Sequence, residues 1–175
     1  MTVSSTFVSA DGDGYEFQMG RWSRRLAPLF INFAGITAAG CILDVGCGTG
    51  SLSFHLAQNH KIGSVRGVDL SSVYIEHAKQ HNSDARLDFQ VANACALPFP
   101  DAAFDHSLSM LVLQFIPQPE LAARELRRVT RPGGRWRQQH GIRAEGSSPF
   151  GCSGTPPPCS TQLQMSAAPN PALDR

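Results

Sequence analysis

The sequence predicts an α/β domain built on a doubly wound parallel sheet of about four to five strands, with helices on both faces. Short apolar runs alternate with segments of helical spacing, as they do in repeated strand–helix units. A loop with glycine at every second position, residues 46–50, follows the first of these runs. Short loops join the segments, so we expect right-handed crossovers between parallel strands.

The composition is that of a globular protein of ordinary size. The 175 residues are 42% hydrophobic and 17% charged, and the formal net charge of +1 provides no general attraction to nucleic acid or acidic membranes. Neither a secretory signal pattern nor an apolar run of about 18 residues occurs, so we expect a cytoplasmic protein without a membrane span. The five cysteines lack paired CxxC spacing, so we expect no metal site.

The N-terminal part predicts a leader followed by one helix. Residues 1–14 are polar and glycine-bearing, which favours a flexible leader. Residues 17–33 predict an amphipathic helix with a kink or restart at Pro28, because proline removes a backbone donor. The apolar positions of this helix are Phe17, Leu26, Leu29, Phe30 and Phe33.

Two strand–helix units come next. The expected strands are residues 41–45 and 64–69, and the expected helices are residues 51–59 and 71–80. Ser71 and Ser72 are N-cap candidates for the second helix, because a serine hydroxyl can accept a hydrogen bond from a backbone N–H.

The third and fourth strands are predicted at residues 87–91 and 104–113, and a helix at residues 119–130. The apolar residues that this helix directs inward are Leu121, Leu126 and Val129. The RPGG turn at residues 131–134 would normally begin another strand, but no apolar strand pattern follows it. The fourth strand is therefore expected to be an uncovered edge.

Residues 136–175 change in character. They contain six of the twelve prolines and no apolar run of strand length, so we expect a disordered tail. Residues 15–135 would then form an incomplete domain. An evolved extension and a shifted reading frame both explain such a tail.

The glycine loop predicts close approach of a small molecule to the backbone. Ligands of open parallel sheets bind beyond the carboxyl ends of the strands, where Gly46, Gly48 and Gly50 lack obstructing side chains. The dinucleotide fingerprint G-x-G-x-x-G needs a third glycine where this chain has Ser51, which argues against nicotinamide binding. Asp44 favours a cationic ammonium or sulfonium group over a pyrophosphate.

Asp69 ends the second predicted strand, about twenty residues after the loop. A carboxylate at this position can accept hydrogen bonds from both hydroxyls of a ribose. The alternative is that Asp69 caps the N-terminus of the following helix.

Four motifs carry a family resemblance. ILDVGCGTG, GVDLS, NACALPFPDAAFD and VTRPGG, in this order, resemble the class I S-adenosylmethionine-dependent methyltransferases. They are most similar to the methyltransferase type 11 group, which includes the ubiquinone and menaquinone biosynthesis methyltransferases. The resemblance covers about residues 15–135 and implies a Rossmann-like fold with S-adenosylmethionine as cofactor. It also indicates a chain truncated after the PGG turn.

The resemblance assigns a set of residues to the cofactor. They are Asp44, Gly46, Gly48, Gly50, Asp69, Leu70, Asn93, Ala94, Met110 and Arg21. Asp44 and the loop would hold the methionine end, Asp69 the ribose hydroxyls and Leu70 the adenine ring. Asn93 stands where the family usually has an aspartate beside the adenine amino group, and an amide oxygen can still accept a hydrogen bond there.

Two further groups of residues are assigned with alternatives. Cys95 either forms a wall for the adenine ring or is a small core residue, and Leu111 would line the methionine chain beside Met110. Similar proteins fold an N-terminal segment over the cofactor, and the alternative here is an amphipathic surface helix. The lid candidates are Tyr15, Met19, Arg21 and Trp22.

The resemblance implies methyl transfer to a small-molecule acceptor that the sequence does not identify. A sulfonium is already a strong electrophile, so positioning and exclusion of water are sufficient and no catalytic residue is assigned. The arginines of residues 124–137 are interpreted as a solvated helix face and its exit turn, so no nucleic-acid partner is expected. An inactive truncated fragment with weak cofactor binding is the alternative, and a nicotinamide-dependent oxidoreductase is a third reading.

Overall fold

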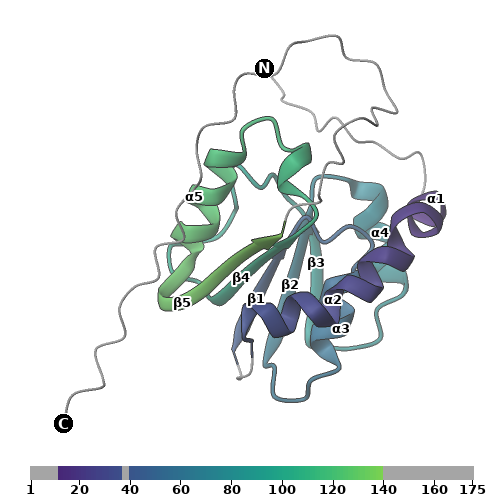
Figure 1. Ribbon diagram of the computed structural model, residues 1–175, viewed down its shortest axis with the longest axis horizontal. Helices are drawn as coiled ribbons and strands as arrows, with labels where there is room; N and C mark the ends of the chain where they lie inside the picture. The colour runs from purple at the N-terminus through teal and green to yellow at the C-terminus, as the bar shows by residue number, and fades with distance from the viewer. Residues whose placement is uncertain (1–11, 37–39, 140–175) are drawn as a thin grey trace. The chain divides into compact units, whose positions relative to one another are not determined.

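The computed structural model describes residues 12–36 and 40–139, so most of the expected leader (1–14) and of the expected tail (136–175) lies outside this part. The described residues of these two segments, 12–14 and 136–139, belong to a helix and to a strand, which corrects both predicted bounds. Five parallel strands form one sheet in the order β3-β2-β1-β4-β5 (Figure 1). The strands are β1 Cys41–Val45, β2 Ser64–Asp69, β3 Leu87–Val91, β4 Phe104–Met110 and β5 Thr130–Gln139. The predicted doubly wound parallel sheet is therefore confirmed.

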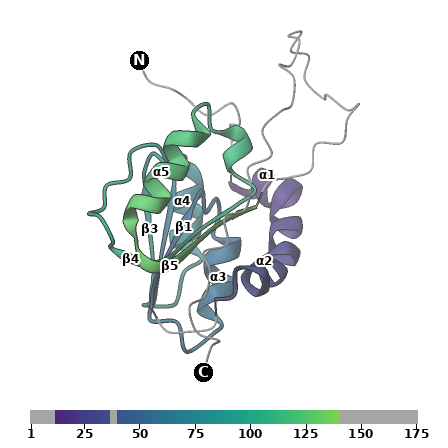
Figure 2. The same ribbon diagram turned by 60° about the vertical axis from the view of Figure 1, so that its left-hand side comes forward.

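Helices cover both faces of this sheet. The helical elements are α1 Gly12–Tyr15, the π-helix η1 Glu16–Gly20, α2 Arg21–Ala34, α3 Ser51–Ala57, α4 Ser72–Gln80, the 3-10 helix η2 Leu113–Phe115 and α5 Pro119–Val129. Helices α2, α3 and α4 share one hydrophobic cluster with the sheet, and α5 shares the other. Figure 2 shows α2 and α3 on the opposite side of the sheet from α5. None of the helices in the described part of the chain is long and apolar enough to cross a membrane.

The burial of β1 explains its central place. Ile42 belongs to the cluster on the α2 side, whereas Leu43 and Val45 belong to the cluster on the α5 side. All three side chains are fully buried. An apolar run without alternation is typical of a parallel strand covered on both faces, and this is the pattern that predicted β1 correctly.

Several predicted bounds are confirmed. The first three strands have the predicted limits, and helices α3, α4 and α5 lie within the ranges predicted for them. Ser71 is the N-cap of α4, because its hydroxyl accepts a hydrogen bond from the Tyr74 amide at 3.4 Å.

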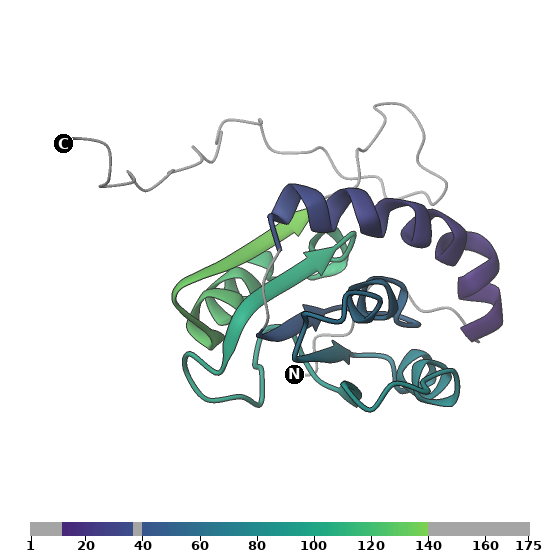
Figure 3. The same ribbon diagram turned by 90° about the horizontal axis from the view of Figure 1, so that it is seen from below.

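The N-terminal helical run differs from its prediction. Elements α1, η1 and α2 follow one another without a break, and α2 continues through Pro28 rather than restarting there (Figure 3). Phe30 is buried against the sheet, whereas Phe17, Leu29 and Phe33 are exposed. The apolar spacing predicted a helix correctly but did not identify the buried face. Small residues such as Ala27 and Ala34 form much of that face.

The fourth strand ends earlier than predicted. β4 stops at Met110 because Leu111 has a φ of +62°, which a continuing strand does not allow. Of the apolar residues that were predicted to extend the strand, Leu113 begins η2 and is buried in the core. Leu111 and Val112 line a cavity described below.

The prediction that no strand follows the PGG turn was wrong. β5 pairs with β4 in parallel and places Trp136 opposite Ser107 and Gln138 opposite Ser109. Gly134 permits this pairing, since a Cβ there would lie 2.4 Å from the Asp105 carbonyl oxygen. Backbone groups of β4 bind any partner strand, whatever its side chains, and one side of an edge strand can carry polar residues. The described strand therefore covers the edge that the sequence left open.

Two leucines of α5, both predicted to point inward, differ in their burial. Leu126 is fully buried, whereas Leu121 is 38% exposed and does not face the core as predicted. We expect Leu126→Ala to lower the free energy of unfolding by about 2 to 5 kcal/mol, because it leaves a cavity in the core. Leu121→Ala, in the same helix, should cost less than about 1 kcal/mol. Urea unfolding of both variants measures the difference, and equal losses would contradict the assignment.

Candidate functional site

The glycine loop joins β1 to α3 and is held against the end of β2 by backbone hydrogen bonds. The amides of Gly46 and Cys47 both donate to the carbonyl oxygen of Val68, at 2.7 and 2.9 Å. The amide of Gly48 donates to Asp69 Oδ2 at 2.9 Å. Three successive amides of the loop are therefore satisfied within the protein.

The loop requires glycine at positions 46 and 48. Their φ angles of +74° and +54° lie in the left-handed region, where a side chain is strained. A Cβ on Gly46 would lie 2.4 Å from the Val112 side chain, and a Cβ on Gly48 would lie 3.0 Å from the Tyr15 hydroxyl. Both glycines let neighbouring segments close on the loop.

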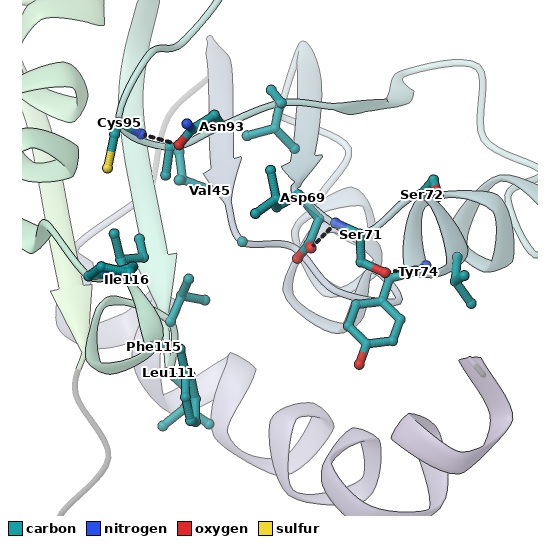
Figure 4. A pocket seen from close by; sticks show the side chains of 18 of the residues that line it. Val45, Asp69, Ser71, Ser72, Tyr74, Asn93, Cys95, Leu111, Phe115 and Ile116 are labelled. Atoms are coloured by element: carbon teal, nitrogen blue, oxygen red, sulfur yellow. Dashed lines mark hydrogen bonds between the residues drawn. The ribbon is translucent and has the colours of Figure 1, made fainter. Parts of the chain in front are cut away.

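Asp69 lies at the centre of the arrangement. Besides the Gly48 amide, its carboxylate accepts the Ser71 amide through Oδ1 at 2.9 Å (Figure 4). Burial raises the pKa of Asp69, and the hydrogen bonds from Ser71, Gly48 and Leu70 oppose that rise. The N-cap of α4 is Ser71, so the alternative prediction that Asp69 caps this helix was wrong.

Asp44 is a buried carboxylate without a cationic partner in the part of the chain that the structure describes. Its side chain is 1% exposed, and Ser53 Oγ donates to Asp44 Oδ2 at 2.7 Å. Burial raises the pKa of Asp44 to about 7, and the nearby charge of Asp69 adds to this rise. A buried carboxylate is costly unless a cation or several donors compensate its charge. The site therefore suits a small cationic group.

A cavity of about 450 Å³ opens beyond the carboxyl ends of β1 and β2. The segments that follow β3 and β4 and the N-terminal helical run complete its wall. Figure 4 shows Asp69 and Ser71 on one side of the cavity and Leu111, Phe115 and Ile116 on the other. This is the edge at which ligands of open parallel sheets bind.

Five of the sequence-predicted cofactor residues line this cavity. They are Gly46, Asp69, Leu70, Asn93 and Ala94. Asp44 and Met110 line a much smaller cavity beside it, and Gly46 and Tyr15 belong to both. The structure thus brings most of the assigned residues to one place.

The other predicted residues lie apart from the two cavities. Gly48, Gly50 and Arg21 line neither of them. Gly50 faces the Phe54 ring at the start of α3, and the Arg21 guanidinium lies 5.2 Å from the centre of the Trp22 ring. Of the lid candidates, Tyr15 and Met19 line the main cavity, whereas Arg21 and Trp22 do not.

Asn93 presents its amide to the cavity in a defined orientation. The Cys95 amide donates to Asn93 Oδ1 at 2.9 Å, as Figure 4 shows. The side-chain NH₂ group is thereby left as the donor of this residue. Cys95 is half-buried and also lines the cavity, so its wall role and its core role are not exclusive.

Sequence reasoning missed part of the cavity wall. Tyr74, Val112, Phe115 and Ile116 line it without having been assigned. The rings of Tyr15 and Tyr74 lie 4.6 Å apart between their centres. The residues of η2 could have been predicted, because the loops that follow parallel strands all reach the edge of the sheet where ligands bind. No local sequence pattern indicated Tyr74, which lies in the first turn of α4.

The charged side chains that line the two cavities are acidic. Among the described residues that line the two cavities, no lysine, arginine or histidine occurs, while Asp44 and Asp69 both do. Burial raises the pKa values of Tyr15 and Cys47, so both groups stay neutral at pH 7. The site therefore favours cations and neutral hydroxyl groups over phosphate.

Comparisons with known proteins agree with this geometry. Residues 43–136 match the family model described as "Methyltransferase domain". A malonyl-[acyl-carrier protein] O-methyltransferase of Erwinia pyrifoliae is 43% identical over 96 residues, which are 53% of this chain and 34% of that protein. A fatty-acid O-methyltransferase of Mycolicibacterium smegmatis is 36% identical over 93 residues, again 53% of this chain and 34% of the relative.

A solved structure shows the same fold. The putative S-adenosyl-L-methionine-dependent methyltransferase of Methanococcus maripaludis superimposes with a TM-score of 0.65 at 25% identity, over 80% of this chain and 68% of that one. The chain spans about a third of the length of the two curated relatives described above. Since the family model matches more than half of the chain, the protein belongs to the methyltransferase domain family and has the class I methyltransferase fold.

Proposed function

We propose that this domain binds S-adenosylmethionine at the glycine-loop cavity and serves the transfer of its methyl group to a small acceptor. The observation that carries the proposal is the pair of buried carboxylates, Asp44 and Asp69, beside a glycine loop whose lining includes no basic side chain among the described residues. A dinucleotide would bring a pyrophosphate to this place, where two carboxylates repel it. The ammonium and sulfonium groups of S-adenosylmethionine are positively charged, so the two carboxylates attract them.

We assign each of these residues to a different part of the cofactor. Asp44 balances the positive charge at the methionine end, and Asp69 accepts hydrogen bonds from the ribose hydroxyls. Asn93 lies at the adenine edge, where its Oδ1 has a second lone pair for the adenine amino group, and Leu70 packs on the ring. When bound, the cofactor supplies an electrophilic methyl group, so the protein's part is to orient the reactants and exclude water. The apolar wall of Leu111, Phe115 and Ile116 suits that exclusion.

The acceptor atom is an oxygen in this proposal. Two of the relatives are named O-methyltransferases, one of malonyl-[acyl-carrier protein] and one of fatty acids. No lysine or histidine lines the described cavity to remove a proton, so we infer an acceptor that arrives ionised, as carboxylic acids do at pH 7. The sulfonium of bound S-adenosylmethionine would offset the negative charge of the site and attract such an acceptor. The relatives give no support to the inactive-fragment alternative.

The proposal predicts a cofactor preference. We expect the chain to bind S-adenosylmethionine and S-adenosylhomocysteine more tightly than NAD, because both carry an ammonium group and neither carries a phosphate. Isothermal titration calorimetry with the three ligands measures this order. Tighter binding of NAD would refute the proposal.

Asp69 provides a test of the ribose contact. We expect Asp69→Ala to weaken S-adenosylhomocysteine binding by about 1.5 to 3 kcal/mol, the range for hydrogen bonds to a charged acceptor. Asp88→Ala is the matched control, since this aspartate is 56% exposed on β3 and pairs with Arg66 away from the cavity. An unchanged affinity in a folded Asp69 variant would contradict the assigned role.

The raised pKa of Asp44 predicts that ligand binding depends on pH. Its carboxyl group, with a pKa of about 7, is protonated in the free protein below that pH, and only the carboxylate attracts the cationic ligand. Binding at pH 6 should therefore release a proton from Asp44, and the affinity should fall by up to about tenfold per pH unit below pH 7. The neighbouring Tyr15 and Cys47 stay neutral in this range and add no slope.

The proton release can be measured directly. Calorimetry at pH 6 in two buffers of different ionisation enthalpy gives the number of protons released on binding. Asp44→Asn keeps the size of the side chain and should lose the Asp44 share of the release. Equal proton release in the wild type and in this variant would show that Asp44 does not titrate on binding.

A further inference from the structure

Glu16 connects the N-terminal helical run to the glycine loop. Thr49 Oγ1 donates a hydrogen bond to Glu16 Oε1, so a residue of η1 is bonded to a residue of the loop. The Arg24 guanidinium, farther along the same run, forms an ion pair with the other oxygen of this carboxylate. Thr49 is 3% exposed and the Glu16 side chain is 20% exposed, which shields the contact from water.

The local sequence is adapted to this contact. Gly20 leaves room for the Glu16 carboxylate, because a Cβ at position 20 would lie 2.2 Å from Glu16 Oε2. Residues Glu16–Gly20 form a π-helical turn, which is wider than an α-helical turn and occurs often at functional sites. Glycine costs helix stability at this position, and here it provides space for the carboxylate.

Tyr15 lies next to the contact and over the glycine loop. Tyr15 immediately precedes Glu16, its hydroxyl lies over Gly48, and its ring contacts Tyr74 of α4. Together with Met19, Tyr15 forms the part of the cavity wall that comes from the helical run. A ligand in the cavity would therefore be enclosed on this side by residues that flank Glu16, which is bonded to Thr49 of the loop.

We propose that Glu16 and Thr49 are positioning residues that hold Tyr15 and Met19 over the cofactor cavity and thereby slow the release of the cofactor. This inference rests on the proposed function, because it assumes that S-adenosylmethionine or its product occupies the cavity. Arg24 lies on the same helical run as Glu16, so its ion pair orients the carboxylate but does not itself join the run to the loop. Among the described residues, the hydroxyl of Thr49 makes the polar bond from the loop to Glu16.

The test compares two substitutions at one position. Thr49→Val keeps nearly the same shape and removes the hydroxyl, whereas Thr49→Ser keeps the hydroxyl. We expect Thr49→Val to raise the dissociation rate of S-adenosylhomocysteine about tenfold, the effect of losing one hydrogen bond to a charged acceptor. Thr49→Ser should restore a rate close to that of the wild type. Stopped-flow displacement of the bound ligand measures all three rates.

A second measurement needs no ligand. Amide hydrogen exchange of the free protein should be faster within residues 15–20 in Thr49→Val than in Thr49→Ser, with unchanged exchange in α5 as evidence that the variant is folded. Equal exchange and equal dissociation rates in the two variants would overturn the inference. Faster exchange with an unchanged dissociation rate would overturn it too, because the bond would then not control release.

The two proposals fail in different ways. If the wild type binds neither S-adenosylmethionine nor S-adenosylhomocysteine, the proposed function is refuted whatever the exchange data show. If the wild type binds the ligand and Thr49→Val releases it at the wild-type rate, only the positioning role of Glu16 and Thr49 is refuted.

Discussion

The hydrogen bonds between the glycine loop and the end of β2 are the constraint on which the site depends. The amides of Gly46 and Cys47 donate to the Val68 carbonyl and the amide of Gly48 donates to the Asp69 carboxylate, so the loop cannot move without losing three hydrogen bonds. Because these donors are already used, they are not available to a phosphate, in contrast to the free amides of typical phosphate-binding loops. The geometry that orients Asp69 therefore also disfavours an anionic ligand.

The electrostatics of the site follow from the same geometry. Asp44 is buried in the central strand, accepts hydrogen bonds from the hydroxyl and the backbone of Ser53, and has no cation among the described residues. Folding thus leaves a carboxylate whose charge is only partly compensated, which lowers the stability of the folded protein. Under the proposed function, the cationic ligand would supply the missing partner.

Much of the fold was predictable from local pattern. The first three strands had unbroken or alternating apolar runs, and the glycine loop and the capping Ser71 are short-range signals. β5 was not predictable because its strand is formed by backbone pairing with β4 and by the space at Gly134, not by its own apolar side chains. The end of β4 was missed for a related reason, since hydrophobic residues after Met110 line a cavity instead of a sheet.

The sequence by itself determined the order of strands and helices, the glycine loop with Asp44 and Asp69, and the class of cofactor that their charge suits. These features depend on residue type and on short spacing, which the sequence displays directly. Only the tertiary structure decided that Tyr15 and Glu16 reach the glycine loop, that Met19 lines the cavity, and that Arg21 and Trp22 do not. Such contacts join residues more than thirty positions apart, as Glu16 and Thr49 are, and arise from packing of the helical run on the sheet rather than from any pattern within it.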